Sequence, residues 1–238
     1  MPAKGRLFVI PSTLGLVPAQ AVLPRRTLEV ARGLACFVAE TPKAARRFLK
    51  GLDSALPLQQ IEIAELSERT PPGRVAALLQ PALAGHDLGL VSDAGCPGVA
   101  DPGAPLVAAA HRAGVRVVPL PGSSAIVLAL MASGLNGQAF AFHGYLPVKP
   151  DARTARLRSL DDAVARTGAT QIFIETPYRN EAMVDAVVAA CRGSTQFCVA
   201  VDLTLDSEEI VSRTVGAWRA APRRSLAKRP AVFLLGRV

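Results

Sequence analysis

The sequence predicts an α/β protein built from two α/β domains, and three observations indicate this fold class. Short runs of β-branched and aromatic residues alternate with longer stretches rich in Ala, Leu and Arg, which is typical of strands followed by helices. The 238 residues exceed the roughly 100–150 residues of a common domain. A run of Pro and Gly at 119–122 interrupts both patterns halfway along the chain. We therefore expect an N-terminal domain of residues 1–120 and a C-terminal domain of residues 121–238.

The N-terminal half alternates strands and helices in regular order. We expect strands at 7–10, 36–39, 61–63, 88–92 and 115–120. We expect helices at 24–34, 41–50, 74–83 and 104–113. Pro24 and Pro42 stand where helices begin, a position that tolerates proline, and Gly51 ends the second helix. Strands separated by helices predict a mainly parallel sheet with right-handed crossovers.

The C-terminal half continues this alternation and then departs from it. We expect strands at 140–143, 171–174, 197–202, 210–213 and 231–235. We expect helices at 123–133, 155–166, 179–190 and 215–220. An acidic turn at 206–209 separates two neighbouring strands, which favours an antiparallel pair. The second sheet is therefore predicted to be mixed.

The charge balance leaves two interpretations open. The formal net charge is +8 and the pI is about 9.9, but each half of the chain carries +4, so neither half is a basic tail. Arg outnumbers Lys by 22 to 5, which fits either a compositional bias or a polyanionic partner. One helical face carries Lys43, Arg46, Arg47 and Lys50 at i+3 and i+4 spacing. That face is either simply solvated or a phosphate contact.

Several classes are excluded or disfavoured. The longest apolar run, residues 125–132, is far shorter than the ~20 residues of a membrane span, and the N-terminal apolar run is too short for a secretory signal. The four cysteines show neither a CxxC nor a paired Cys/His spacing, so we expect no metal site. No dinucleotide fingerprint, P-loop, GxSxG or HExxH motif occurs. We expect a cytoplasmic protein with reduced thiols.

Two loops rich in small residues follow predicted strands, where α/β sheets bind ligands. The first is SDAGCPGVADPG at 92–103, and the second is PGSSA at 121–125. In the first loop, Asp93 comes directly after a strand, and this position favours a functional role. Asp101 fits the cap of the following helix. The second loop can cap a helix or hold polar atoms of a ligand.

Two further loops carry polar side chains after strands. In the segment 175–180, Thr176 and Pro177 fit a helix start, but a cap requires neither Tyr178 nor Arg179. The segment 143–150 contains His143, Tyr145 and Lys149 on a loop stiffened by proline. A single His after an apolar strand is more often structural, whereas the Tyr and the Lys suit substrate contacts.

The motifs SDAGCPGVADPG, PLPGSSA, FHGYLPVKP and FIETPYRN, in this order and spacing, resemble the tetrapyrrole methylase family over nearly the whole chain. Within the family, the chain resembles the branch that includes the small-subunit ribosomal RNA cytidine 2′-O-methyltransferase. It resembles a shorter bacterial branch more closely still. Cys96 replaces the usual Thr, Tyr178 replaces the usual His, and residues 202–205 lack an Arg–Glu pair and a Lys.

The resemblance implies a methyltransferase that binds S-adenosylmethionine in a cleft between two α/β domains, and a homodimer. The positions that match cofactor contacts are Leu14, Ser92, Asp93, Ala94, Cys96, Ser124, Ala125, Thr176, Pro230 and Ala231. Glu175 also matches a contact, and it is the first candidate for the base that accepts a proton from the nucleophile, with Tyr178 second. Expected substrate contacts are His143, Tyr145, Lys149 and Arg179, and the row Arg153, Arg156 and Arg158 could hold phosphates.

The expected reaction is in-line methyl transfer to an oxygen or nitrogen nucleophile, for which positioning alone can contribute roughly 7–11 kcal/mol. Ribosomal RNA ribose is one expected substrate. Two alternatives stay open: a methyltransferase for a small, tetrapyrrole-like molecule, and a cofactor-binding protein without catalysis.

Overall fold

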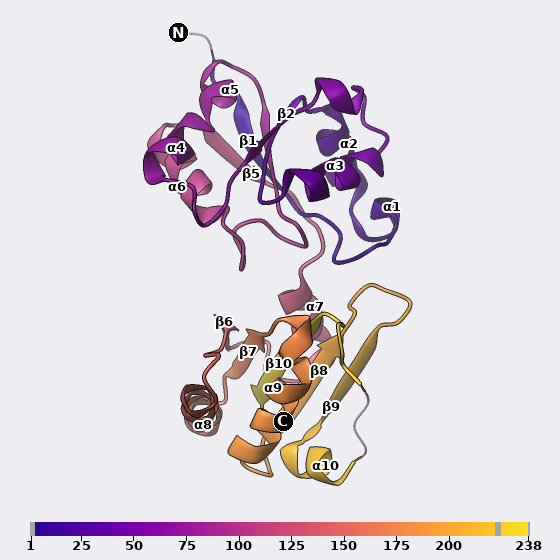
Figure 1. Cartoon of the computed structure of the whole chain (residues 1–238), viewed down its shortest axis with the longest axis vertical. Coiled ribbons are helices and arrows are strands. Elements are labelled where there is room, and N and C mark those ends of the chain that lie inside the picture. The colour runs from indigo at the N-terminus through magenta and orange to yellow at the C-terminus, as the bar shows by residue number, and fades with distance from the viewer. Residues whose placement is uncertain (1–2, 222–224, 238) are drawn as a thin grey trace. The chain divides into compact units, whose positions relative to one another are not determined.

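The computed structural model describes residues 3–221 and 225–237. The chain forms two compact units, Met1–Ser124 and Ala125–Val238, which divide just after the Pro- and Gly-rich run (Figure 1). That residues 1–120 and 121–238 are separate domains stays a prediction. Each unit contains its own five-stranded sheet.

The sheet of the first unit is parallel throughout, with strand order β3-β2-β4-β1-β5. Its strands are β1 Arg6–Ile10, β2 Cys36–Ala39, β3 Glu62–Glu65, β4 Leu88–Val91 and β5 Arg116–Pro119. Its helices are α1 Ala19–Val22, α2 Arg25–Gly33, α3 Pro42–Lys50, α4 Pro72–Ala77, α5 Gln80–Leu83 and α6 Ala104–Arg112, with a 3-10 turn η1 at Leu58–Gln60. Both faces of the sheet are covered, which explains why the central strands are uninterrupted apolar runs.

Two apolar cores flank this sheet. The core that contains Phe37 packs against α1, α2 and α3, and the core that contains Leu90 packs against α4, α5 and α6 (Figure 1). Gly89 in β4 makes the first core possible, because a Cβ there would lie only 2.6 Å from the Phe37 ring. The predicted parallel sheet of this half is therefore confirmed.

The single helix predicted at 74–83 is wrong, since the structure has α4 and α5 instead. Pro81 has no N–H group to donate to the carbonyl four residues earlier, so the first helix ends and a second begins. The short elements α1 and η1 were not predicted, because three or four residues are too few to show a periodic pattern.

The sheet of the second unit is mixed, with strand order β6-β7-β10-β8-β9. Its strands are β6 Phe140–Tyr145, β7 Thr170–Ile174, β8 Gln196–Val201, β9 Glu209–Thr214 and β10 Ala231–Gly236. Its helices are α7 Ala125–Ser133, α8 Pro150–Thr167, α9 Asn180–Ala190 and α10 Val215–Ala220, with a 3-10 turn η2 at Pro177–Arg179. Only β6 and β7 are parallel, while β10 and β9 run antiparallel to their neighbours, which confirms the predicted mixed sheet.

Helices α8, α9 and α10 cover one face of this sheet, and α7 lies on the other. The core of the first face is built on the stacked rings of Phe173, Phe233 and Phe197, with Trp218 of α10 beside Phe197. On the opposite face, the Ser212 hydroxyl donates to the Ser133 carbonyl at the end of α7. Helix α8 begins at Pro150, earlier than the predicted residue 155, because proline fits a first helical turn and Asp151 suits the same turn.

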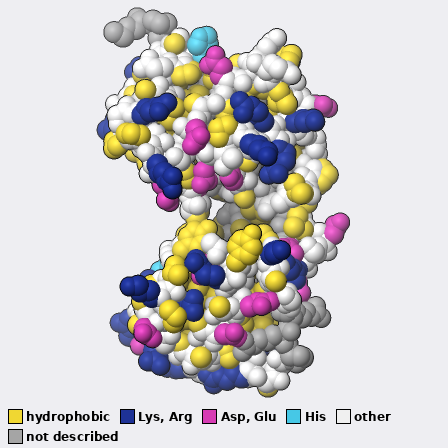
Figure 2. Space-filling view, viewed as in Figure 1, with side chains coloured by type: hydrophobic (Ala, Val, Ile, Leu, Met, Phe, Trp, Pro, Cys, Tyr) yellow, Lys and Arg dark blue, Asp and Glu magenta, His cyan; other side chains and the backbone are white. Residues whose placement is uncertain are grey.

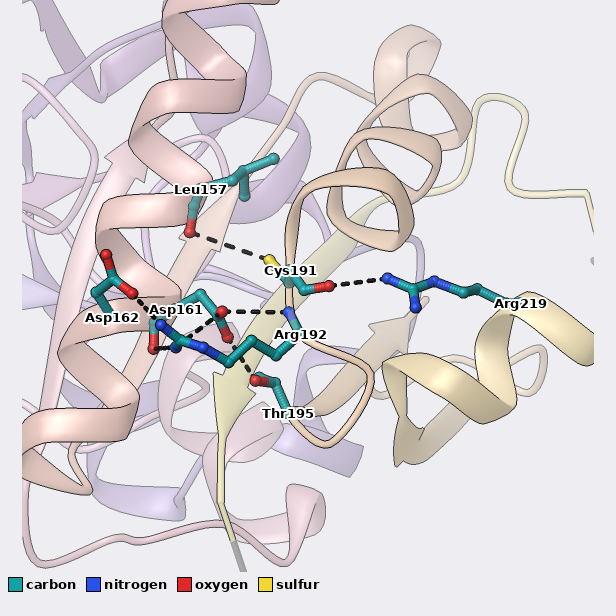
Figure 3. Close-up of polar contacts among 7 residues, drawn as sticks. All are labelled: Leu157, Asp161, Asp162, Cys191, Arg192, Thr195 and Arg219. Carbon is teal, nitrogen blue, oxygen red and sulfur yellow. Dashed lines mark hydrogen bonds and ion pairs between the residues drawn. The ribbon is translucent and has the colours of Figure 1, made fainter.

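A polar network centred on the buried Asp161 joins α8 to the segment between α9 and β8 (Figure 3). Both carboxylate oxygens of Asp161 accept hydrogen bonds, one from the Arg192 amide at 3.2 Å and the other from the Thr195 hydroxyl. The Arg192 guanidinium also contacts Asp161 and Asp162. Cys191 is buried next to this network, and burial raises its pKa to about 12, so its thiol stays protonated.

Candidate functional site

A hollow of about 430 Å³ opens in the first unit, where β1 and β4 end. Its lining includes three residues that the family resemblance matched to cofactor contacts or their loop, namely Leu14, Ser92 and Asp93. The lining also includes Ser12, which is only 3% exposed and whose hydroxyl has no hydrogen-bond partner among the described residues. A buried hydroxyl without a partner is costly, so this hollow is suited to a polar ligand.

The loop after β4 is held by its own hydrogen bonds. The Ser92 hydroxyl donates to the Gly95 carbonyl at 2.8 Å, and the Ser12 amide donates to that same carbonyl at 2.9 Å. Gly95 has a φ of +71°, and a Cβ at this position would lie 3.1 Å from the Leu14 side chain. Glycine is therefore required where the loop after β4 meets the loop after β1.

Asp93 connects this loop to helix α3. Its carboxylate accepts hydrogen bonds from the Thr41 amide at 3.1 Å and from the Thr41 hydroxyl at 2.7 Å. Asp93 and Ala94 are both exposed. The geometry therefore gives Asp93 one structural partner and leaves its side chain accessible to a ligand.

Asp101 does not cap the following helix as predicted. The N-cap residue of α6 is Gly103, and the Asp101 carboxylate instead accepts from the amides of Gly98 and Gly103 at 2.8 and 2.7 Å. Burial raises the pKa of Asp101, although these two hydrogen bonds lower it. The Asp101 carboxylate thus fixes the conformation of the loop between β4 and α6.

Cys96 and Ser124 lie together in the first unit. The Cys96 thiol contacts the Ser123 carbonyl at 3.4 Å, and a hydrogen bond with Ser124 partly offsets the rise in the Cys96 pKa that burial causes. Burial also raises the pKa of Glu40, and the neighbouring carboxylates of Asp93, Asp101 and Glu68 raise it further. This end of the sheet is therefore a place of concentrated negative charge.

The second unit contains a buried carboxylate at the end of β7. One oxygen of Glu175 accepts hydrogen bonds from the Thr176 amide at 2.7 Å and from the Arg179 guanidinium at 2.6 Å. The other oxygen, Oε2, is buried and has no hydrogen-bond partner among the described residues, and the same holds for Arg179 Nε. The hydrogen bond with Glu175 raises the pKa of Arg179. Glu175 thus has one oxygen fixed and one available to a hydrogen-bond donor.

Several predicted site residues lie around Glu175. Tyr145 of β6 pairs with Ile174 and interacts electrostatically with Arg179. Ile174 also pairs with Val232, which places Pro230 and Ala231 next to the same end of β7. Tyr178 is 82% exposed, and no hydrogen bond among the described residues connects it to Glu175.

His143 has both ring nitrogens engaged. The Gln171 amide nitrogen donates to the Ala169 carbonyl, so the Gln171 oxygen accepts from His143 Nε2, at 2.8 Å. His143 Nδ1 then accepts from the Arg156 guanidinium at 2.9 Å. His143 therefore orients Arg156, and its role in substrate binding stays a prediction. Lys149 is the exposed N-cap residue of α8.

The structure thus gathers the predicted residues into two sets, one in each unit. Leu14, Ser92, Asp93, Ala94, Cys96 and Ser124 lie at the carboxyl end of the first sheet, and Tyr145, Glu175, Thr176, Arg179, Pro230 and Ala231 surround the end of β7. Ala125 opens α7. The predicted cleft between the domains stays a prediction. Sequence reasoning missed Ser12, since nothing local in the sequence distinguishes a buried serine without a partner from an ordinary one.

Among residues 3–221 and 225–237, no group of three or more His, Cys, Asp or Glu side chains is arranged to hold a metal. In the same residues, no helix has the length and apolar character needed to cross a membrane.

The fold resembles that of solved methyltransferases. Uroporphyrin-III C-methyltransferase from Thermus thermophilus, complexed with S-adenosylhomocysteine, has a TM-score of 0.58 at 17% identity, and the match covers 98% of this chain and 97% of that one. At such low identity the likeness shows the fold alone. It defines the chain as a two-unit α/β protein of the kind found in methyltransferases.

Residues 21–218 match the family model described as tetrapyrrole (corrin/porphyrin) methylases. The chain therefore belongs to this methyltransferase family. It is 33% identical over 237 residues to ribosomal RNA small subunit methyltransferase I of Xylella fastidiosa, with 99% of this chain and 82% of the relative covered. It is 38% identical over 177 residues to the protein of the same name in Pseudomonas aeruginosa, with 74% and 58% covered. The match thus spans less than two thirds of the latter relative.

Proposed function

We propose that this protein transfers the methyl group of S-adenosylmethionine to ribosomal RNA. The similarity to ribosomal RNA methyltransferases carries the substrate proposal, because it reaches 33% identity over almost the whole chain, whereas the T. thermophilus tetrapyrrole enzyme is only 17% identical. The hollow in the first unit and the partly unpaired carboxylate in the second support the proposal, because the reaction needs a place for the cofactor and an acceptor for a proton.

The residues present fit the cofactor. We propose that Leu14, Ser92, Asp93 and Ala94 hold it in the first unit, together with Ser12. The Ser12 hydroxyl lacks a partner that the ribose or amino acid part of the cofactor could supply, and the apolar side chain of Leu14 suits the adenosine. Cys96, Ser124, Ala125, Thr176, Pro230 and Ala231 belong to the same proposal, as positions matched through the family motifs.

When bound, the cofactor supplies an activated methyl group on a sulfonium. The chain itself must align the nucleophile and exclude water. We propose that Glu175 Oε2 accepts the hydrogen bond, and then the proton, of the attacking hydroxyl. Support comes from its geometry, because Arg179 and the Thr176 amide fix Oε1 and leave Oε2 buried without a partner. Tyr178 is the alternative acceptor, although its side chain is 82% exposed.

The proposed substrate contacts lie around the end of β7 and the start of α8. Tyr145 and Arg179 stand next to Glu175, and Lys149 is exposed at the start of α8. His143 serves indirectly, because its ring positions Arg156. An aromatic ring and two cations suit a nucleotide, whose base can stack and whose phosphates attract cations.

Labelled methyl transfer tests this function. The protein is incubated with methyl-labelled S-adenosylmethionine and, in parallel, with small ribosomal subunits from cells that lack the protein or with reduced uroporphyrin III. We expect label in the ribosomal RNA only. Label in the tetrapyrrole alone would establish the small-molecule alternative, which the family name favours. Binding of the cofactor without methyl transfer to the ribosomal RNA or to the tetrapyrrole would support the alternative of a cofactor-binding protein without catalysis.

Two further expectations belong to this proposal. An enzyme that modifies ribosomal RNA meets its substrate in the cytoplasm. We also propose a homodimer, supported by α7, whose residues 125–132 are all apolar although Met131 is 74% exposed. Light scattering should give twice the monomer mass for the wild type, and Met131→Glu should lower it. A monomeric wild type at micromolar concentration would contradict the dimer.

A further inference from the structure

Helix α3 exposes four cations that have no partner among the described residues. Lys43, Arg46, Arg47 and Lys50 are all exposed, and none forms a hydrogen bond or ion pair with a described residue. By contrast, Arg6 and Arg25 of the same unit are paired, with Asp87 and Glu29. Since α3 contains no acidic residue, this α3 face is a concentrated positive surface, and the nearby carboxylates of Glu40 and Asp93 lie at the start of the helix.

The packing of α3 fixes the direction of this face. Ala45 and Leu49 are buried, with Leu49 in the core below, so the cations at i, i+3, i+4 and i+7 point away from the sheet. In the space-filling view, dark-blue side chains gather over the part of the first unit where α3 lies (Figure 2). The α3 face is therefore accessible to a large partner.

The α3 face also adjoins the proposed cofactor hollow. Arg47 and Phe48 line the hollow together with Ser92 and Asp93. The hydrogen bonds from Thr41 to Asp93 fix the start of α3 to the loop that follows β4. A strand bound on α3 would thus be held at the edge of the hollow.

The dimensions and chemistry of the α3 face suit a nucleic-acid backbone. From Lys43 to Lys50 the helix rises about 10 Å, which is roughly three nucleotide steps of a duplex strand at about 3.4 Å each. Guanidinium groups bind phosphate oxygens in a bidentate manner, and lysines add point charges. By contrast, the row on α8 is less available, since Arg156 donates to His143 and, of Arg153, Arg156 and Arg158, only Arg158 is exposed.

We infer that the α3 face is the docking surface for the sugar–phosphate backbone of the RNA substrate. We rest this inference on the proposed function, because it states where the RNA of that function binds. Docking on α3 supplies affinity without reading sequence, and it leaves the choice of nucleotide to the residues around Glu175.

The test compares two double variants in a salt titration of binding to a transcribed fragment of small-subunit ribosomal RNA. Arg46→Gln/Lys50→Gln removes two charges from the α3 face and leaves Arg47, which lines the hollow. The matched control, Arg112→Gln/Arg116→Gln, removes two exposed cations from the opposite end of the same sheet, where α6 ends and β5 begins. We expect the α3 variant to lower the slope of log K against log salt by about 1.8, at about 0.9 per duplex phosphate contact. We expect the control to match the wild type.

Calorimetry with S-adenosylhomocysteine on the same three proteins separates this inference from the proposed function. Equal cofactor binding with the slope change confined to the α3 variant supports docking on α3. An unchanged slope in the α3 variant, or equal changes in both variants, overturns the inference. A loss of uroporphyrin III binding in the α3 variant, with RNA binding unchanged, would also overturn it. Lack of cofactor binding by the wild type would instead refute the proposed function.

Discussion

Asp161 and Glu175 are both buried carboxylates of the second unit, and each is paired with an arginine, yet their surroundings differ in one respect. Both oxygens of Asp161 accept hydrogen bonds, from the Arg192 amide and the Thr195 hydroxyl. Only one oxygen of Glu175 does so, and Oε2 is buried without a partner. A fully satisfied carboxylate stabilises the fold, whereas a half-satisfied one lowers stability and is retained where a ligand completes it.

Asp161→Ala should produce the largest loss of stability. Removing the Asp161 carboxylate leaves the Thr195 hydroxyl and the Arg192 amide without their acceptor, and each unsatisfied buried donor costs about 1–3 kcal/mol. Chemical denaturation measures this free energy, and Asp162→Ala is the matched control, because Asp162 is exposed and contacts the same arginine. Cofactor affinity per folded molecule should not change. An equal loss of unfolding free energy in the two variants would show that the Asp161 network contributes no more stability than the exposed contact of Asp162.

Glu175→Gln should affect turnover far more than stability. The amide keeps an oxygen for Arg179 but cannot accept the proton, so kcat should fall about 10²–10⁴-fold. The melting temperature serves as the control. Tyr178→Phe should retain activity, since that side chain is exposed. If both variants turned over the RNA as the wild type does, the assignment of the site would be wrong.

Ser12→Ala should weaken cofactor binding without destabilising the protein. The hydroxyl makes no hydrogen bond to a described residue, so its removal costs the fold nothing and relieves a buried unpaired group. The lost hydrogen bond to the ligand corresponds to about 0.5–1.5 kcal/mol, which is roughly 2–12-fold in Kd. Calorimetry and thermal melting measure the two effects. A lower melting temperature together with unchanged affinity would contradict this role.

Glu40→Gln should give the smallest effect, and its sign depends on pH. Burial and neighbouring carboxylates raise the pKa of Glu40, so the folded state holds this proton more tightly than the unfolded state. The stabilisation from the protonated form is complete at low pH and is lost as the pH rises through the raised pKa. At pH 7 the variant should therefore be more stable than the wild type, by under about 1 kcal/mol, and should melt at a higher temperature. Below about pH 4 the two proteins should melt at the same temperature. A lower melting temperature at pH 7 would contradict this.

The fold was more predictable than the site. Alternating apolar runs defined both sheets, because each buried strand leaves a local pattern. They missed the short elements α1 and η1, placed the start of α8 too late, and joined α4 and α5, which a single proline divides. The loops after β4 and β7 could be identified from small residues and polar clusters at strand ends. The hydrogen-bond partners of each side chain could not be identified in this way. Nothing in the sequence shows that His143 is engaged on both nitrogens or that Ser12 lacks a partner, since both depend on residues distant in the chain.

Calorimetric titration of the wild-type protein with S-adenosylhomocysteine tests the central claim most directly. A methyltransferase with the hollow and the half-paired Glu175 described above should bind this product saturably, at one site per chain, and Ser12→Ala should bind it more weakly. The absence of binding by a folded wild-type protein would contradict the proposed cofactor and, with it, the proposed methyl transfer.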